Sequence, residues 1–78
     1  MQKYIEGKLT FVEGKGVLIV EDGSTIPLAE GILIQVMDEL YGWTDGFFQN
    51  GKGFLHSRGT DELQPGDRIR MKKEAFIS

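Results

Sequence analysis

The sequence predicts a mainly β protein, a small antiparallel barrel or roll of five to six strands, in a single domain over residues 1–78. Two observations predict this class. Eleven glycines and two prolines divide the 78 residues into segments of strand length. Several segments alternate apolar and polar residues with a period of two, as half-buried strands do. The chain has no cysteine, so packing must stabilise its core without disulfides or thiolate metal sites.

The first half of the chain predicts a strand followed by a hairpin. Residues 5–11 place apolar side chains at one parity and polar side chains at the other. Residues 17–20 are apolar and β-branched, and they lead into Asp22-Gly23, a dipeptide typical of a hairpin turn. Residues 26–28 then continue on the returning strand.

Residues 32–41 fit two structures. They form either a strand over 32–37 or a helix with one apolar face that ends at Gly42. A helix here would make the protein α+β. The β-branched content favours the strand.

The second half predicts further strands around Trp43 and over residues 54–56 and 68–72. The last of these has the cleanest alternation and is typical of an edge or rim strand with one wet face. Two patterns recur near one half-chain apart: Leu28-x-x-Gly31-x-x-Ile34-x-Val36 as Leu63-x-x-Gly66-x-x-Ile69-x-Met71, and Gly14-Lys15-Gly16-x-Leu18 as Gly51-Lys52-Gly53-x-Leu55. The recurrence indicates two similar β-meanders.

The core of so short a chain must use most of its large apolar residues. We expect the following residues to form it: Ile5, Leu9, Phe11, Leu18, Val20, Ile26, Leu28, Ile34, Val36, Phe47, Leu55, Leu63 and Ile69.

Catalysis is poorly provided for. His56 is the one histidine, and no nucleophile elbow, phosphate loop or His-x-x-x-His pair accompanies it. The adjacent pairs Asp38-Glu39 and Asp61-Glu62 should diverge rather than share a proton or a metal. We therefore expect no enzymatic activity, no catalytic residues, no metal site and no cofactor.

Charge and hydropathy limit the possible locations and partners. Residues 1–39 hold three lysines against seven acidic residues, whereas residues 40–78 hold six basic against five acidic residues. No segment approaches the roughly 20 apolar residues that span a bilayer, and the N-terminus lacks the apolar run of a secretory leader. The expected location is the cytoplasm, with no membrane partner.

Protein binding is the first functional hypothesis. Tyr41 and Trp43 lie beside Asp38 and Glu39, and they predict an aromatic floor with an acidic rim. Such a surface suits a basic or proline-containing peptide. The protein would then be an adaptor or inhibitor that docks on a basic surface of a partner.

Nucleic-acid binding is the alternative hypothesis. On the last strand Arg68, Arg70 and Lys72 should point the same way, at a spacing near that of phosphates along one nucleic-acid strand, with Lys73 at the end. Such a barrel would bind RNA or single-stranded DNA. A third possibility is a homodimer, because residues 32–37 are apolar at both parities if they form a strand.

The order of these features resembles a family of short bacterial proteins of unknown function, found largely in Gram-positive genomes, including mobile elements and prophages. The resemblance covers residues 4–73. It rests on Glu6-Gly7-Lys8-Leu9, Asp22-Gly23, Leu28-x-x-Gly31 before Ile34-x-Val36, Trp43, and Leu63-x-x-Gly66-x-x-Ile69-x-Met71. This chain has Gly31-Ile32 where the family often has Gly-Asp. The resemblance implies a compact SH3-like β-barrel and names no activity.

Overall fold

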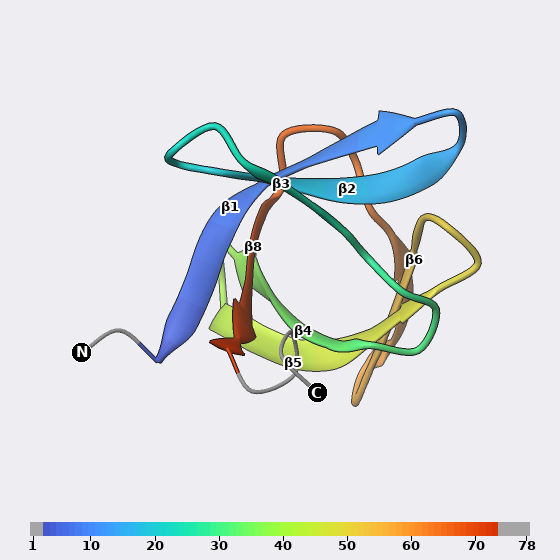
Figure 1. Ribbon diagram of the computed structural model, residues 1–78. Coiled ribbons are helices and arrows are strands. Elements are labelled where there is room, and N and C mark those ends of the chain that lie inside the picture. The colour runs from blue at the N-terminus through green and yellow to red at the C-terminus, as the bar shows by residue number, and fades with distance from the viewer. Residues whose placement is uncertain (1–2, 74–78) are drawn as a thin grey trace.

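The computed structural model describes residues 3–73 and arranges them as eight β-strands (Figure 1). The strands are β1 (Tyr4–Val12), β2 (Lys15–Val20), β3 (Thr25–Pro27), β4 (Leu33–Asp38), β5 (Gly42–Gln49), β6 (Gly53–His56), β7 (Gly59–Glu62) and β8 (Arg68–Lys72). The predicted mainly β class is confirmed. The predicted number of five to six strands is wrong: the structure has eight, and the four-residue strand β7 lies where no strand was predicted.

All eight strands belong to one open antiparallel sheet with the order β3-β2-β1-β8-β4-β5-β6-β7. The segment that fitted either a strand or a helix is strand β4, and the helix alternative is wrong. β4 pairs with β5 along its whole length and with β8 at Gln35↔Arg70 and Val36↔Ile69. A strand with partners on both sides lies in the middle of the sheet, which explains why its apolar residues occur at both parities.

The sheet is strongly curved, so that β1, β2 and β3 lie across from β4, β5 and β6 (Figure 1). Gly16 in β2 allows a close approach at this crossing, because a Cβ added there would lie 2.5 Å from Cζ of Phe48 in β5. The hairpin turns also meet, since a Cβ on Gly51 would lie 3.0 Å from the carbonyl oxygen of Gly14. The core fills the space inside the curve.

Among residues 3–73, ten apolar side chains are buried: Leu9, Leu18, Ile26, Leu28, Ile34, Phe48, Phe54, Leu63, Ile69 and Met71. Ile5, Phe11, Val20 and Val36 from the predicted core pack against them and are partly buried. Two predicted core residues are wrong: Phe47 is 47% exposed and Leu55 is 36% exposed. Phe47 pairs with Leu55 and Phe48 pairs with Phe54, so the prediction chose the wrong face of both strands by one residue.

The pairing pattern is symmetric about the Gln35↔Arg70 pair. Replacing β1–β4 by β5–β8, and the reverse, gives the same strand order read from the other edge. The hydrogen bonds at the turns repeat as well. The N–H of Leu28 donates to the carbonyl of Gly16 at 3.0 Å, and that of Leu63 donates to Lys52 at 2.8 Å. Gly31 donates to Phe48 and Gly66 donates to Leu9, both at 2.7 Å. Phe48 donates to Ile32 at 3.0 Å, and Leu9 donates to Asp67 at 2.9 Å. The chain thus consists of two similar halves, as the sequence recurrence predicts.

Candidate functional site

The outer, convex face of the sheet carries a stack of aromatic and arginine side chains. The guanidinium carbon of Arg70 in β8 lies 4.1 Å from the ring centre of Tyr4 in β1 and 4.3 Å from that of Trp43 in β5. Its Nε donates to Oε1 of Gln35 at 2.5 Å, and Nε2 of Gln35 donates to Oδ1 of Asp45 at 2.6 Å. Arg70 is therefore held between two rings and is only half-exposed.

Arg68 extends this stack. Its Nη2 lies 2.7 Å from Oε2 of Glu6, and its guanidinium carbon is 5.5 Å from the ring centre of Trp43. Both arginines therefore cover Trp43, which is half-buried. Trp43 does not present a free aromatic floor in this arrangement.

The predicted acidic rim lies at the β4–β5 turn. Oδ1 of Asp38 accepts hydrogen bonds from the backbone N–H of Leu40 at 2.7 Å and of Tyr41 at 3.1 Å. These two bonds favour the carboxylate and lower the pKa of Asp38 below its ordinary value of 3.8. Asp38 therefore holds the turn, and Glu39 next to it is exposed.

Tyr41 is 61% exposed and Leu40 is 85% exposed at the tip of the same turn. The guanidinium carbon of Arg58 lies 4.0 Å from the Tyr41 ring centre. Of the predicted residues, Asp38, Glu39 and Tyr41 thus lie on one hairpin tip, while the contacts of Trp43 are with the arginines of β8.

The predicted basic strand is observed as β8, but it lies between β1 and β4, so the expectation of an edge strand is wrong. Arg68, Lys72 and Lys73 are exposed and Arg70 is half-exposed. The Glu6 carboxylate already binds Arg68, and the Gln35 amide already binds Arg70. Of these four basic residues, only Lys72 and Lys73 have no side-chain hydrogen bond or ion pair within the described residues 3–73.

An apolar row that neither the peptide-binding nor the nucleic-acid-binding hypothesis included crosses the outer face of β4, β5 and β6. Leu33, Phe47 and Leu55 are adjacent in the sheet, because Leu33 pairs with Phe47 and Phe47 pairs with Leu55. Their exposed fractions are 42%, 47% and 36%. The sequence signal was the apolar content of residues 32–37 at both parities. We call Leu33, Phe47 and Leu55 the apolar row.

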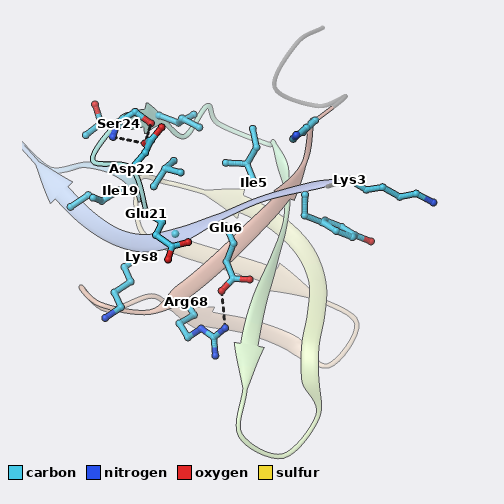
Figure 2. A pocket seen from close by; sticks show the side chains of 15 residues that line it. Lys3, Ile5, Glu6, Lys8, Ile19, Glu21, Asp22, Ser24 and Arg68 are labelled. Carbon is cyan, nitrogen blue, oxygen red and sulfur yellow. Dashed lines mark hydrogen bonds and ion pairs between the residues drawn. The ribbon is translucent and has the colours of Figure 1, made fainter. Parts of the chain in front are cut away.

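Two hollows lie near these features. The smaller, of about 220 Å³, lies where β4 and β8 diverge beyond their two paired positions; it is bordered by Tyr4, Leu33, Gln35 and Lys72. The larger is an open groove of about 1110 Å³ between the first residues of β1 and the β2–β3 hairpin, shown in Figure 2. In that hairpin the hydroxyl and then the N–H of Ser24 bind Oδ1 of Asp22, which lowers the pKa of Asp22.

His56 has a structural position. Its side chain is 6% exposed, Nε2 lies 2.7 Å from Oδ2 of Asp61, and Nδ1 lies 3.2 Å from the backbone N of Arg58. The Arg58 N–H donates to Nδ1, so Nε2 carries a hydrogen that it donates to Asp61. Both ring nitrogens therefore hold the β6–β7 turn.

Within residues 3–73 no group of three or more potential metal ligands comes together, and no helix has the length and apolarity needed to cross a bilayer. No protein-family model, curated protein or solved structure matches this chain.

Proposed function

We propose that the protein is a non-enzymatic binding module that recognises another protein through the outer face of β4, β5 and β6. The observation that carries this proposal is the apolar row, three adjacent side chains that remain between about a third and a half exposed. A contiguous exposed apolar surface on so small a domain is typical of an interaction site.

The hairpin tip extends this surface. Leu40 and Tyr41 are the two most exposed large apolar side chains in residues 3–73. Asp38 accepts hydrogen bonds that hold the tip, and Glu39 adds a negative charge. Trp43 lies on the adjoining strand and packs against Arg70. The partner we propose presents an apolar patch with a basic rim, because Glu39 and the exposed Asp45 border this face.

A pair of matched variants tests the proposal. Phe47→Ser removes the centre of the apolar row, while Val12→Ser changes a side chain of similar exposure, 54%, at the far end of β1. Affinity capture with quantitative mass spectrometry should find proteins retained by the wild type and by Val12→Ser but lost with Phe47→Ser. Unfolding curves of both variants provide the control for folding. Equal retention by Phe47→Ser would contradict the proposal.

The charge of the tip provides a second test with the partner so found. Glu39→Lys should slow association, and the association rate of this variant should depend less on salt than that of the wild type. We choose Glu39 rather than Asp38, because replacing Asp38 would also remove the two hydrogen bonds of the turn. Unchanged association kinetics would exclude the acidic tip from the interface.

Nucleic-acid binding is the second candidate function, favoured by the three cations Arg68, Arg70 and Lys72 at alternate positions of β8. The exposed lysines would have to supply the free charge. A Lys72→Glu, Lys73→Glu variant should lose binding to single-stranded oligonucleotides at low salt, while Lys15→Glu in the β1–β2 hairpin should keep it. An NMR titration without salt-sensitive shifts at β8 would exclude this function.

The finer fold and location are part of the same proposal. We propose that the curved sheet has an SH3-like architecture, supported by the small size, the antiparallel pairing and the single core inside the curve. The proposed place of action is the cytoplasm of a bacterium, where a protein-binding module from a mobile element or prophage would meet its partner. Fractionation of cells producing a tagged chain tests the location.

A further inference from the structure

We propose that the open edge of β1 at residues 4–6 binds an extended peptide segment of a partner protein by strand addition. The site is the groove between β1 and the β2–β3 hairpin (Figure 2). It lies apart from the apolar row, and recognition there would use backbone hydrogen bonds, so this inference goes beyond the proposed function.

Among the described residues 3–73, nothing pairs with one side of the β1 backbone in this region. Leu9 exchanges hydrogen bonds with the turn before β8, and the carbonyl of Lys3 accepts the N–H of Lys73 at 3.1 Å, so odd-numbered residues of β1 face β8. Because the direction alternates along a strand, Tyr4 and Glu6 direct their N–H and C=O groups to the opposite side. Pairing with β2 starts only at Gly7↔Val20. Within residues 3–73, the N–H of Glu6 and both backbone groups of Tyr4 therefore remain for the groove.

Gly7 creates this opening. A Cβ at Gly7 would overlap the carbonyl oxygen of Ile19, so only glycine lets β1 cross β2 so closely and then bend away. After Val20 the chain turns into β3 instead of following β1. The two segments diverge, and the groove lies between them.

In the second half of the chain, a side chain from the turn approaches the matching region of β5. Gly46 approaches the carbonyl oxygen of Leu55 in the same way, since a Cβ there would lie 2.5 Å from it. Beyond Gly46, Arg58 crosses the edge of β5, and its Nη2 donates to Oγ1 of Thr44 at 3.3 Å. In the first half, Asp22 of the corresponding turn is instead bonded to Ser24 within its own turn. Within residues 3–73, no side chain of this turn is hydrogen-bonded to β1.

The outer edges of the sheet carry protection that β1 lacks. Because hydrogen bonds alternate along β3, the backbone groups of Pro27 point away from β2. Proline has no N–H that another strand could bind. β7 at the other edge carries the exposed acidic residues Asp61 and Glu62. Natural sheets use proline and charge in this way against unwanted strand pairing. Neither Tyr4 nor Glu6 is a proline, and Arg68 turns the charge of Glu6 towards β8.

The lining of the groove indicates the chemistry of the peptide. Ile5, Val20 and Ile26 form its apolar part. Lys3, Lys8 and Lys73 line it on the β1 and β8 side, together with the ion pair of Glu6 with Arg68, and the acidic Glu21 and Asp22 line it on the hairpin side. We therefore expect an extended segment with a central apolar residue and charged residues of both signs beside it.

Selection from a phage-displayed library of random ten-residue peptides, with the full chain immobilised, provides the probe. The selected peptide should bind with an affinity that Glu6→Pro weakens about tenfold or more, because proline removes one N–H of the open edge. Glu62→Pro is the matched control, since it makes the same change at an outward position of β7. The Glu62→Pro and Phe47→Ser variants should bind the peptide as the wild type does. Unaffected binding by Phe47→Ser separates this site from the proposed protein-binding face.

A measurement on the wild type covers the case in which Glu6→Pro does not fold. Saturating peptide should slow hydrogen exchange at the amides of Tyr4 and Glu6 about tenfold or more and leave Thr60 in β7 unchanged. Three results would each overturn the proposal: no enrichment from the library, unchanged exchange at both amides, or occupation of the same edge by a second copy of the chain in sedimentation and NMR experiments.

Discussion

Replacing Gly16 with alanine should destabilise the protein, because the new methyl group would enter the core. Its carbon would lie 2.5 Å from Cζ of Phe48, whereas non-bonded carbons prefer roughly 3.5 to 4.0 Å. The ring would have to move by about 1 Å or more in a core where Phe48 is 2% exposed. Overpacking of this kind costs about 1 to 3 kcal/mol, which lowers the Tm of a domain of this size by roughly 4 to 24 °C.

The sign of this effect makes the test sharp. Glycine in a strand is less favourable than alanine by about 0.5 to 1 kcal/mol, so Gly16→Ala would stabilise the protein if β2 did not cross β5 here. Thermal and urea unfolding of Gly16→Ala, Phe48→Leu and the double variant measure the coupling. We expect the double variant to be more stable than the sum of the single changes implies, by about 0.5 kcal/mol or more. A Gly16→Ala variant as stable as the wild type would refute the curvature that brings these strands together.

Three further predictions concern other parts of the sheet. Gly7→Ala should abolish the native circular dichroism spectrum, because the added methyl group would overlap the carbonyl oxygen of Ile19. The hydrogen bonds to Asp38 lower its pKa in the folded state, so its contribution to stability is present above the ordinary pKa of 3.8 and is lost as the pH falls below that value. The amide chemical shifts of Leu40 and Tyr41, which donate to Asp38, should report this loss in NMR spectra. Asp38→Asn should remove the titration. Arg70→Lys should shift the fluorescence of Trp43 to longer wavelength and cost about 0.5 to 1.5 kcal/mol, because an ammonium group cannot stack between two rings as a guanidinium does; unchanged emission from this single tryptophan would contradict the stack.

Local sequence patterns predicted the strands well and the faces of two strands poorly. Alternation and turn residues depend on neighbours along the chain, so they indicated β1, β2 and β8 directly. Phe47 and Phe48 are adjacent, and either could face the core. The same one-residue error entered the recurrence, which matched Leu18 with Leu55; the pairing matches Leu18 with Phe54, and both of these are buried.

The candidate site was harder to predict because it depends on strand order. Tyr4, Trp43 and Arg70 are far apart in the sequence, and they meet only because β1, β8, β4 and β5 are neighbours in the sheet. Composition identified the arginines and the tryptophan as separate candidates. It contained no information that Arg70 would cover Trp43.

Because the pairing is symmetric, a chain that carries the same strands in another order could form the same sheet. β4 and β5 are joined by a turn, and β8 and β1 hold the equivalent positions as neighbours without a covalent link, with Lys73 hydrogen-bonded to Lys3. A linker from β8 to β1 would complete a second hairpin of the same kind. The chain could then be opened at the exposed Leu40 with every strand neighbour preserved. Such a circular permutant would exchange the two halves while keeping one core.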